Sequence, residues 1–238
     1  MGVGINAMPV TFVAHALALI AAIMMLVWSI SFRGGFAWEA TNKNLIFNLH
    51  PFLMLVGFII LGGEAIISYK SLPLEKPVKK LIHLVLHAIA LALGILGICA
   101  AFKNQNECNF SNLSSLHSWI GIGVISLYGF QWLYSFGLFF YPGGSSNLRS
   151  GLLPWHAILG LFVFVLAVGN AALGFLENLT FMENEGLDEF GNEAYLVNFM
   201  AIVTILFGAS VVLTVSAKSE STSSPSVDDD SNYSYSAI

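Results

Sequence analysis

The chain has 238 residues, of which 56% are hydrophobic and 10% charged, and its formal net charge is −5. A soluble domain carries about 25% charged residues, so this composition excludes a wholly soluble fold and predicts that lipid covers much of the surface. The small negative charge excludes a nucleic-acid-binding protein, which needs a basic face. The two cysteines allow no disulfide framework and form no zinc motif.

Six apolar stretches follow one another along the chain, each long enough to cross a hydrocarbon core of about 30 Å as a helix. They cover residues 10–32, 45–69, 81–102, 119–141, 154–176 and 195–217. We therefore expect residues 1–217 to form one all-α membrane domain with six transmembrane helices. The Ser-rich and acidic residues 218–238 are predicted to be a disordered cytosolic tail.

The basic residues indicate the orientation. An even number of spans places both termini on one side of the membrane, together with the loops after the second and fourth spans. That side holds six of the nine basic residues, Lys70, Lys76, Lys79, Lys80, Arg149 and Lys218. The positive-inside rule therefore predicts that both termini are cytosolic.

Four histidines lie at matched depths in four consecutive spans. His50 and His117 lie near the non-cytosolic face, and His83 and His156 lie near the cytosolic face. Ionisable side chains in hydrocarbon are costly and indicate function. Paired histidines on facing helices of a bundle can hold a haem iron from both sides, so this pattern predicts two haems in series across the bilayer.

Other interpretations of these histidines stay open at this point. His87 lies one turn after His83 and competes for the same ligand role, and His15 stands alone in the first span. A proton-coupled transporter or channel could use intramembrane histidines without haem, but it predicts polar residues near the midplane. Residues 91–97 and 159–168 are instead apolar and rich in Gly.

Several motifs resemble those of one family. Leu116-His117-Ser118-Trp119 followed by Gly121 resembles its LHSWxG signature, and the segment from Ala65 to Lys70 resembles its ALLxYR signature with Lys70 in place of the arginine. The segments around the other three histidines of the matched set are also similar. In these motifs the chain resembles the cytochrome b561 family, and most of all its plant members.

The resemblance implies a fold and an activity. Helices two to five are expected to form a four-helix bundle that holds two b-type haems, one between His50 and His117 and the other between His83 and His156. The protein would carry single electrons from cytosolic ascorbate to monodehydroascorbate or a ferric chelate on the other side. His83 is preferred to His87 because its spacing to His117 matches the family. The family also implies a homodimer. Its plant members imply a location in an endomembrane, of which the vacuolar membrane is preferred.

The resemblance also implies a cytosolic site for the ascorbate anion, formed by Lys76, Lys80 and Arg149. Only Lys80 is placed on the His83 face by helical spacing, because Lys76 is expected in a loop. Lys70 is expected to bind a haem propionate or the substrate anion. The alternative is that these cations only set the topology and contact lipid phosphate.

The non-cytosolic haem has further expected neighbours. By resemblance, these are Asn112, Leu113, Ser114, Ser115 and Glu177. Many family members have a histidine in the loop after the third span, where this chain has Gln105. Glutamine forms hydrogen bonds but does not titrate near neutrality, which puts proton-coupled chemistry at the outer substrate site in doubt. Glu64, an acid inside the second span, either matches a family position or pairs with a nearby lysine.

Overall fold

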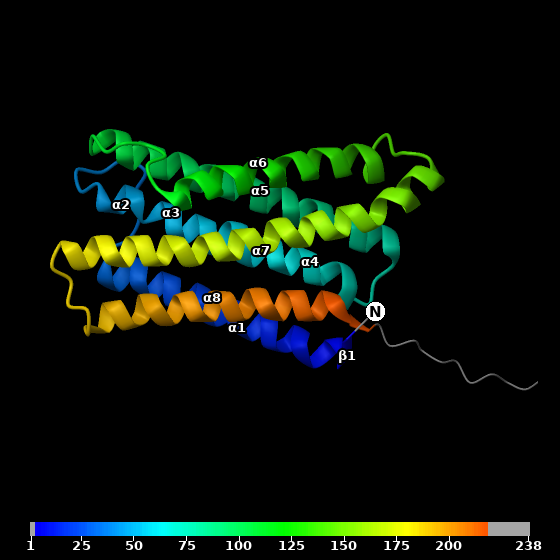
Figure 1. Cartoon of the computed structure of the whole chain (residues 1–238), viewed down its shortest axis with the longest axis horizontal. Helices are drawn as coiled ribbons and strands as arrows, with labels where there is room; N and C mark the ends of the chain where they lie inside the picture. The colour runs from blue at the N-terminus through cyan, green and yellow to red at the C-terminus, as the bar shows by residue number, and fades with distance from the viewer. Residues whose placement is uncertain (1–2, 219–238) are drawn as a thin grey trace, which may run out of the picture.

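The computed structural model describes residues 3–218, with side chains for residues 7–217, and almost all of this part is helical (Figure 1). Six helical segments are long and apolar enough to cross a membrane, as predicted. They are Ala7–Phe32, Asn44–Ser71, Lys76–Glu107, Leu116–Phe140, Ser146–Asn184 and Asn192–Ser216. Beyond residue 218, the predicted tail lies outside the described residues.

Three of the six segments contain a stretch of π-helix. In order, the elements are β1 (Val3–Asn6), α1 (Ala7–Val27), η1 (Trp28–Phe32), α2 (Asn44–Phe47), α3 (Leu49–Phe52), η2 (Leu53–Ile60), α4 (Leu61–Ser71), α5 (Lys76–Glu107), α6 (Leu116–Ser135), η3 (Phe136–Phe140), α7 (Ser146–Asn184), α8 (Asn192–Ser216) and β2 (Ala217–Lys218). The π-helix η2 follows Pro51, which has no N–H to donate within the helix. π-Helical turns occur often at functional sites.

Two of the segments extend well beyond the predicted apolar stretches. α5 begins at Lys76, so the expectation that Lys76 lies in a loop is wrong. The predicted apolar stretch does not include residues 76–80, because several of them are charged, but charged residues also form helices. Proline is favoured in the first turn of a helix, where Pro77 lies. α7 begins at Ser146, since the Ser145 side chain accepts a hydrogen bond from the Leu148 N–H and caps the helix. Pro154, expected at the start, lies inside this helix.

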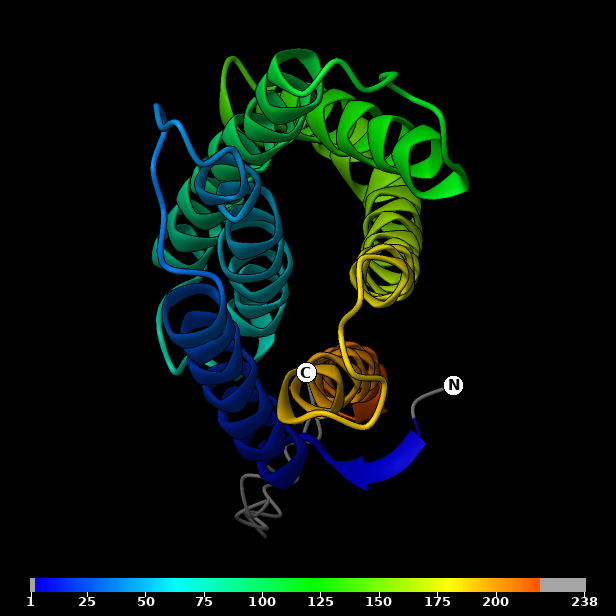
Figure 2. The same ribbon diagram turned by 90° about the vertical axis from the view of Figure 1, so that its left-hand side faces the viewer.

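The six segments stand side by side around a ring when viewed along the helices (Figure 2). α1 packs along α8, α8 packs on α7, α7 on α6, and α5 lies between α6 and α4. The second to fifth segments therefore form the predicted four-helix bundle, and the first and sixth segments cover one side of it. β1 and β2 pair in parallel, which brings the two described ends of the chain together at one end of the bundle (Figure 1).

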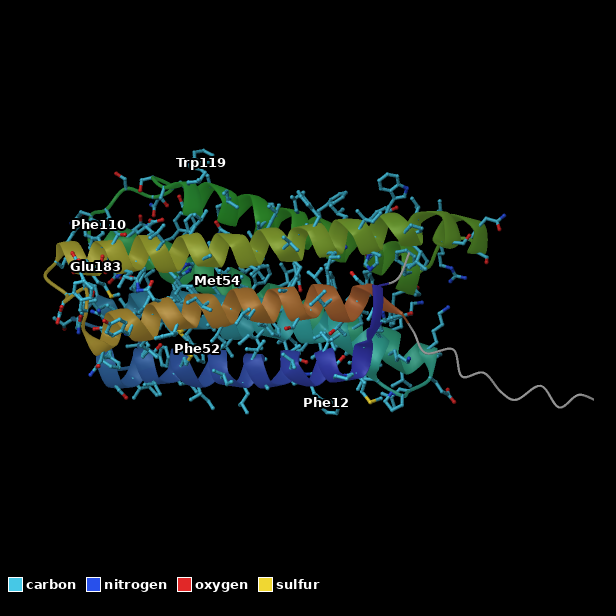
Figure 3. All side chains as sticks on the ribbon, turned by 60° about the horizontal axis from the view of Figure 1, so that its bottom comes forward. Phe12, Phe52, Met54, Phe110, Trp119 and Glu183 are labelled. Carbon is cyan, nitrogen blue, oxygen red and sulfur yellow. The ribbon has the colours of Figure 1, made fainter. Side chains whose placement is uncertain are left out.

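Buried apolar side chains hold the sixth segment against the bundle. Phe207 of α8 is fully buried and its ring lies against that of Phe164 of α7. A Cβ atom at Gly63 would come within 2.6 Å of the Phe207 ring, so glycine is required for α4 to approach α8. The outer surface is also apolar: Phe12 and Trp119 point away from the bundle and are 68% and 65% exposed (Figure 3). This surface suits a lipid environment.

Candidate functional site: two histidine pairs

His50 and His117 face each other near the end of the bundle that lies opposite the chain termini. Their ring centres are 6.1 Å apart and the ring planes meet at 81°. His50 donates its Nδ1 hydrogen to the Gly97 carbonyl oxygen of α5, 3.0 Å away. His117 donates its Nδ1 hydrogen to the Asn170 carbonyl oxygen of α7, 2.9 Å away. Both rings are therefore fixed, and neither Nε2 atom has a hydrogen-bond partner among the described residues.

His83 and His156 form a similar pair near the other end. Their ring centres are 6.2 Å apart, with planes at 72°. His83 donates its Nδ1 hydrogen to the Ala65 carbonyl oxygen of α4, 2.8 Å away. The Nδ1 atom of His156 lies 2.9 Å from the Ser135 hydroxyl of α6. The sequence-based prediction of four histidines at two matched depths thus corresponds to two close pairs.

The two pairs are linked by a repeated spacing on two helices. Gly97, the acceptor for His50, follows His83 on α5 by 14 residues (97 minus 83). Asn170, the acceptor for His117, follows His156 on α7 by 14 residues (170 minus 156). At about 1.5 Å per residue, each helix places the two pairs about 21 Å apart along the bundle.

Each pair offers two metal ligands and no more. In the described residues, no group of three or more His, Cys, Asp or Glu side chains is placed to hold a bare metal ion. A metal between two imidazoles, with metal–nitrogen bonds of about 2 Å, places the ring centres roughly 6 Å apart, as both pairs have them. Two axial histidines suit an iron whose other ligands come from a porphyrin. The Nδ1 hydrogen bonds are those that metal-bound histidines usually make.

A cavity of about 440 Å³ surrounds the His50–His117 pair, within the usual size of ligand sites. A Cβ at Gly174 would come within 2.7 Å of the His117 ring, so only glycine leaves this ring in place. Two buried polar atoms on the cavity wall have no partner among the described residues, Nε of Arg33 and Oδ1 of Asn170. Unpaired buried polar groups are costly, so these atoms fit a bound polar or charged group.

The predicted neighbours of this pair divide into two groups. Gln105, Leu113, Ser115 and Glu177 line the cavity together with the two histidines. Asn112 and Ser114 lie exposed in the loop before α6, where the Asn112 amide donates to the Asn106 side chain. Ser115 also accepts a hydrogen bond from the Ser118 N–H and caps α6, which fixes the start of the helix that carries His117.

The predicted ascorbate-binding cations lie at the end of the bundle nearest His83 and His156. Lys76, Lys80 and His83 follow one another at spacings that place them on one face of α5, and Arg149 lies in the first turn of α7. None of these cations forms an ion pair with another described side chain. At the opposite end, Arg33 pairs with Glu193 and Lys43 with Glu107, at 2.5 and 2.6 Å.

Lys70 has a different environment from the other cations. Its ammonium group donates to the Val215 carbonyl oxygen, 2.7 Å away, and to the Ala217 carbonyl oxygen. These carbonyls are at the end of α8, where the last turn of a helix leaves acceptors unpaired. Lys70 therefore closes the C-terminal end of α8 in this structure.

The remaining histidines have partners that the sequence did not identify. His87 lies with its Nδ1 atom 2.5 Å from the Tyr128 hydroxyl, and its ring centre is 4.3 Å from that of His83. His15 pairs with Glu64, with 2.8 Å between Nδ1 and Oε2. Glu64 therefore pairs with a histidine of the first span rather than with a lysine. The sequence held no signal for this contact, because α1 and α4 meet only in the folded bundle.

The chain is similar to several known proteins. The family model for eukaryotic cytochrome b561 matches residues 49–182. The chain is 80% identical to transmembrane ascorbate ferrireductase 1 of Arabidopsis thaliana, over the whole of both chains. It is 62% identical to ascorbate-specific transmembrane electron transporter 2 of Zea mays, over 90% of this chain and 91% of that one. It is 38% identical to a transmembrane ascorbate-dependent reductase of Sus scrofa, over 78% of this chain and 73% of that one.

Proposed function

The chain belongs to the eukaryotic cytochrome b561 family, and on that basis we propose that it is an ascorbate-dependent transmembrane oxidoreductase. It carries single electrons from ascorbate across the membrane to an acceptor on the other side. The relatives named above are a ferrireductase, an electron transporter and a reductase, and each of their names includes ascorbate. A transporter or channel without haem is not favoured by these relatives.

Two b-type haems bind to the protein, one at each histidine pair. The observation that carries this proposal is the equal separation of the two pairs, 6.1 and 6.2 Å between ring centres. When bound, a haem supplies one-electron chemistry at its iron. His50 and His117 hold one iron and His83 and His156 the other, so neither iron keeps an open position for a substrate. The bonds from Nδ1 to backbone carbonyl oxygens hold the imidazoles of His50, His83 and His117 in the tautomer that binds through Nε2.

Lys76, Lys80 and Arg149 bind the ascorbate anion at the cytosolic end. The absence of ion pairs between these cations and other described side chains supports this role, since their charge is available to an anionic ligand. Lys76 and Lys80 share a face of α5 with His83, so an anion held by both lies at the helix end that leads to this histidine. Attraction of an anion also raises its local concentration at this entrance.

Gln105 and the outer cavity bind the electron acceptor, either monodehydroascorbate or a ferric chelate. The position of Gln105 on the cavity wall with His50 and His117 supports this assignment. Its amide group donates and accepts hydrogen bonds but does not exchange a proton with the acceptor. Glu177, Leu113 and Ser115 contact the outer haem from the same wall. Asn112 and Ser114 approach it from the loop before α6, and Lys70 binds a propionate or the substrate anion only if it leaves the α8 carbonyls.

The protein spans an endomembrane, for which the vacuolar membrane is the preferred assignment, and both termini face the cytosol. Six of nine basic residues at one end of the bundle support this orientation. The family resemblance supports a homodimer.

The proposal is tested by purifying the full chain from cells with an ample haem supply. We expect the reduced spectrum of a b-type haem, two haems per chain, and full reduction by ascorbate. In vesicles, ascorbate on the Lys80 side should reduce a ferric chelate on the other side. Protein that folds and binds no haem would contradict the proposed function. Protein that binds haem but is not reduced by ascorbate would contradict the choice of donor.

A further inference from the structure

We propose that Ser135 positions His156 and sets the redox potential of the haem at the His83–His156 pair. This inference rests on the proposed haem ligation. The observation behind it is a difference among the four paired histidines: His50, His83 and His117 donate to backbone carbonyl oxygens. Only His156, of the four, has a side-chain hydroxyl at this position, 2.9 Å from its Nδ1 atom.

The hydrogen bonds are reciprocal between neighbouring segments. The second segment carries His50 and supplies the Ala65 carbonyl to His83, while α5 carries His83 and supplies the Gly97 carbonyl to His50. The fourth and fifth segments repeat this exchange, because α7 carries His156 and accepts from His117. On α6, however, the return partner is a side chain. The Ser135 hydroxyl lies 2.9 Å from the His156 Nδ1 atom, and the Gln131 amide nitrogen, which cannot accept a hydrogen bond, lies 3.5 Å from it. Among the four paired histidines, only His156 therefore has an Nδ1 partner that a single substitution, at Ser135, can remove.

The Ser135 hydroxyl lies toward the histidine of the neighbouring helix. Ser135 is the last residue of α6, directly before the π-helix η3. Hydroxyls elsewhere in the spans, such as that of Ser210, donate to a carbonyl of their own helix. Gln131, one turn earlier on α6, donates to the His156 carbonyl oxygen at 3.0 Å. α6 therefore contacts both the backbone and the ring of His156.

Glycine makes this close contact possible. A Cβ atom at Gly160 would come within 2.7 Å of the Gln131 amide nitrogen, so any larger residue would push Gln131 away from His156. The Oε1 atom of Gln131 is buried and has no partner among the described residues. Gln131 and Ser135 also line a small cavity of about 60 Å³ with His156. The contact between α6 and His156 is thus close at both positions, with polar groups on one side of the ring.

The nature of the acceptor affects the electron density on the imidazole. A histidine that donates to a strong acceptor becomes more basic and stabilises the ferric iron. A serine hydroxyl is a weaker acceptor than an amide carbonyl, and it can rotate away. His156 is therefore a less basic ligand than the other three histidines, which raises the potential of its haem. Ser135 acts through His156 and touches neither substrate nor iron.

The test is a redox titration of the haem-loaded full chain, followed by visible absorbance and by electron paramagnetic resonance. We expect Ser135→Ala to raise the potential of one haem, the one whose signal disappears in His83→Ala, and to leave the other unchanged. Ser135→Thr, which keeps the hydroxyl, should behave as the unmodified protein. Ser210→Ala removes a hydroxyl of α8 that bonds within its own helix and should shift neither potential.

The outcomes separate this inference from the proposed function. If the unmodified chain binds no haem, the proposed function fails. If both haems are present and Ser135→Ala leaves both potentials unchanged, or if Ser135→Thr shifts the potential as much as Ser135→Ala does, the role of Ser135 is contradicted. If Ser135→Ala loses one haem, Ser135→Cys provides the comparison, because a thiol is a weaker acceptor than a hydroxyl. We expect Ser135→Cys to raise the potential of the haem at the His83–His156 pair. An unchanged potential in this variant would overturn the inference.

Discussion

His50 and His83 each donate a hydrogen bond to the membrane-spanning segment that carries the other: His50 to the Gly97 carbonyl of the third segment, and His83 to the Ala65 carbonyl of the second segment. The two rings therefore depend on one helix contact, although they belong to different pairs. A shift of the second segment along α5 would disturb both rings at once. The geometry of the two proposed haem sites is thus coupled through the packing of the second and third spans.

The ligand assignment predicts different results for two neighbouring histidines. Replacing His83 by Ala should reduce the haem content from two per chain to one and slow reduction by ascorbate, because the ring that faces His156 at 6.2 Å is lost. Replacing His87 by Ala removes a ring bonded to Tyr128 and should leave two haems. The haem-to-protein ratio, from the absorbance of the reduced pigment, measures both. A single haem in His87→Ala with two in His83→Ala would reverse the assignment.

The close approach of α7 to His117 predicts that a single methyl group is disruptive. In Gly174→Ala the new Cβ lies 2.7 Å from the His117 ring, so the ring must move out of line with His50. We expect loss of the outer haem and destabilisation by about 1–3 kcal/mol, as in other overpacked sites. Thermal unfolding and haem content provide the measurements.

Gly169 is the matched control for this substitution. It lies on the same helix, and a Cβ there meets nothing within 4 Å. Gly169→Ala should keep both haems and stabilise the helix by up to about 1 kcal/mol. Equal haem loss in the two variants would show that α7 tolerates no added methyl group, and the specific role of Gly174 would be refuted.

The unpaired cations of α5 predict a change in apparent ascorbate affinity. Lys80→Gln should raise the ascorbate concentration for half-maximal reduction about two- to fivefold, the effect of one solvent-accessible charge, with both haems retained. Lys79→Gln is the matched control, because Lys79 points about 100° away around the helix. The effect of Lys80→Gln should shrink at high salt. Identical kinetics for the two variants at low salt would favour a role in topology alone.

The contact between Lys70 and the end of α8 predicts a structural effect. Lys70→Met removes the donor to the Val215 and Ala217 carbonyls and should destabilise this end of the protein by about 1–3 kcal/mol. Lys70→Arg, which keeps a cation and its donors, should restore most of this stability. Hydrogen exchange at the end of α8 measures the effect. Lost haem in Lys70→Met with unchanged exchange at α8 would instead support the propionate role expected from the sequence.

The number of spans, their order and the four paired histidines were predictable from the amino-acid sequence. A single apolar run in the bilayer can satisfy its backbone hydrogen bonds within itself only as a helix. Depth follows from residue number because the rise per residue of a helix is nearly constant. The family resemblance also came from short motifs around these histidines. These features depend on local order along the chain.

The partners of each side chain were decided only by the tertiary structure. Every residue has a carbonyl, so nothing in the sequence marks Gly97 and Asn170 as acceptors for His50 and His117. The π-helical turns change which face a residue presents, and the packing of α1 on α4 created the His15–Glu64 pair. The sequence assigned the positive charge to one end of the molecule. It did not show whether those cations are free of ion pairs and so able to bind an anionic ligand. Ion pairing depends on which helices meet, and this leaves Lys80 unpaired at one end while Arg33 is paired with Glu193 at the other.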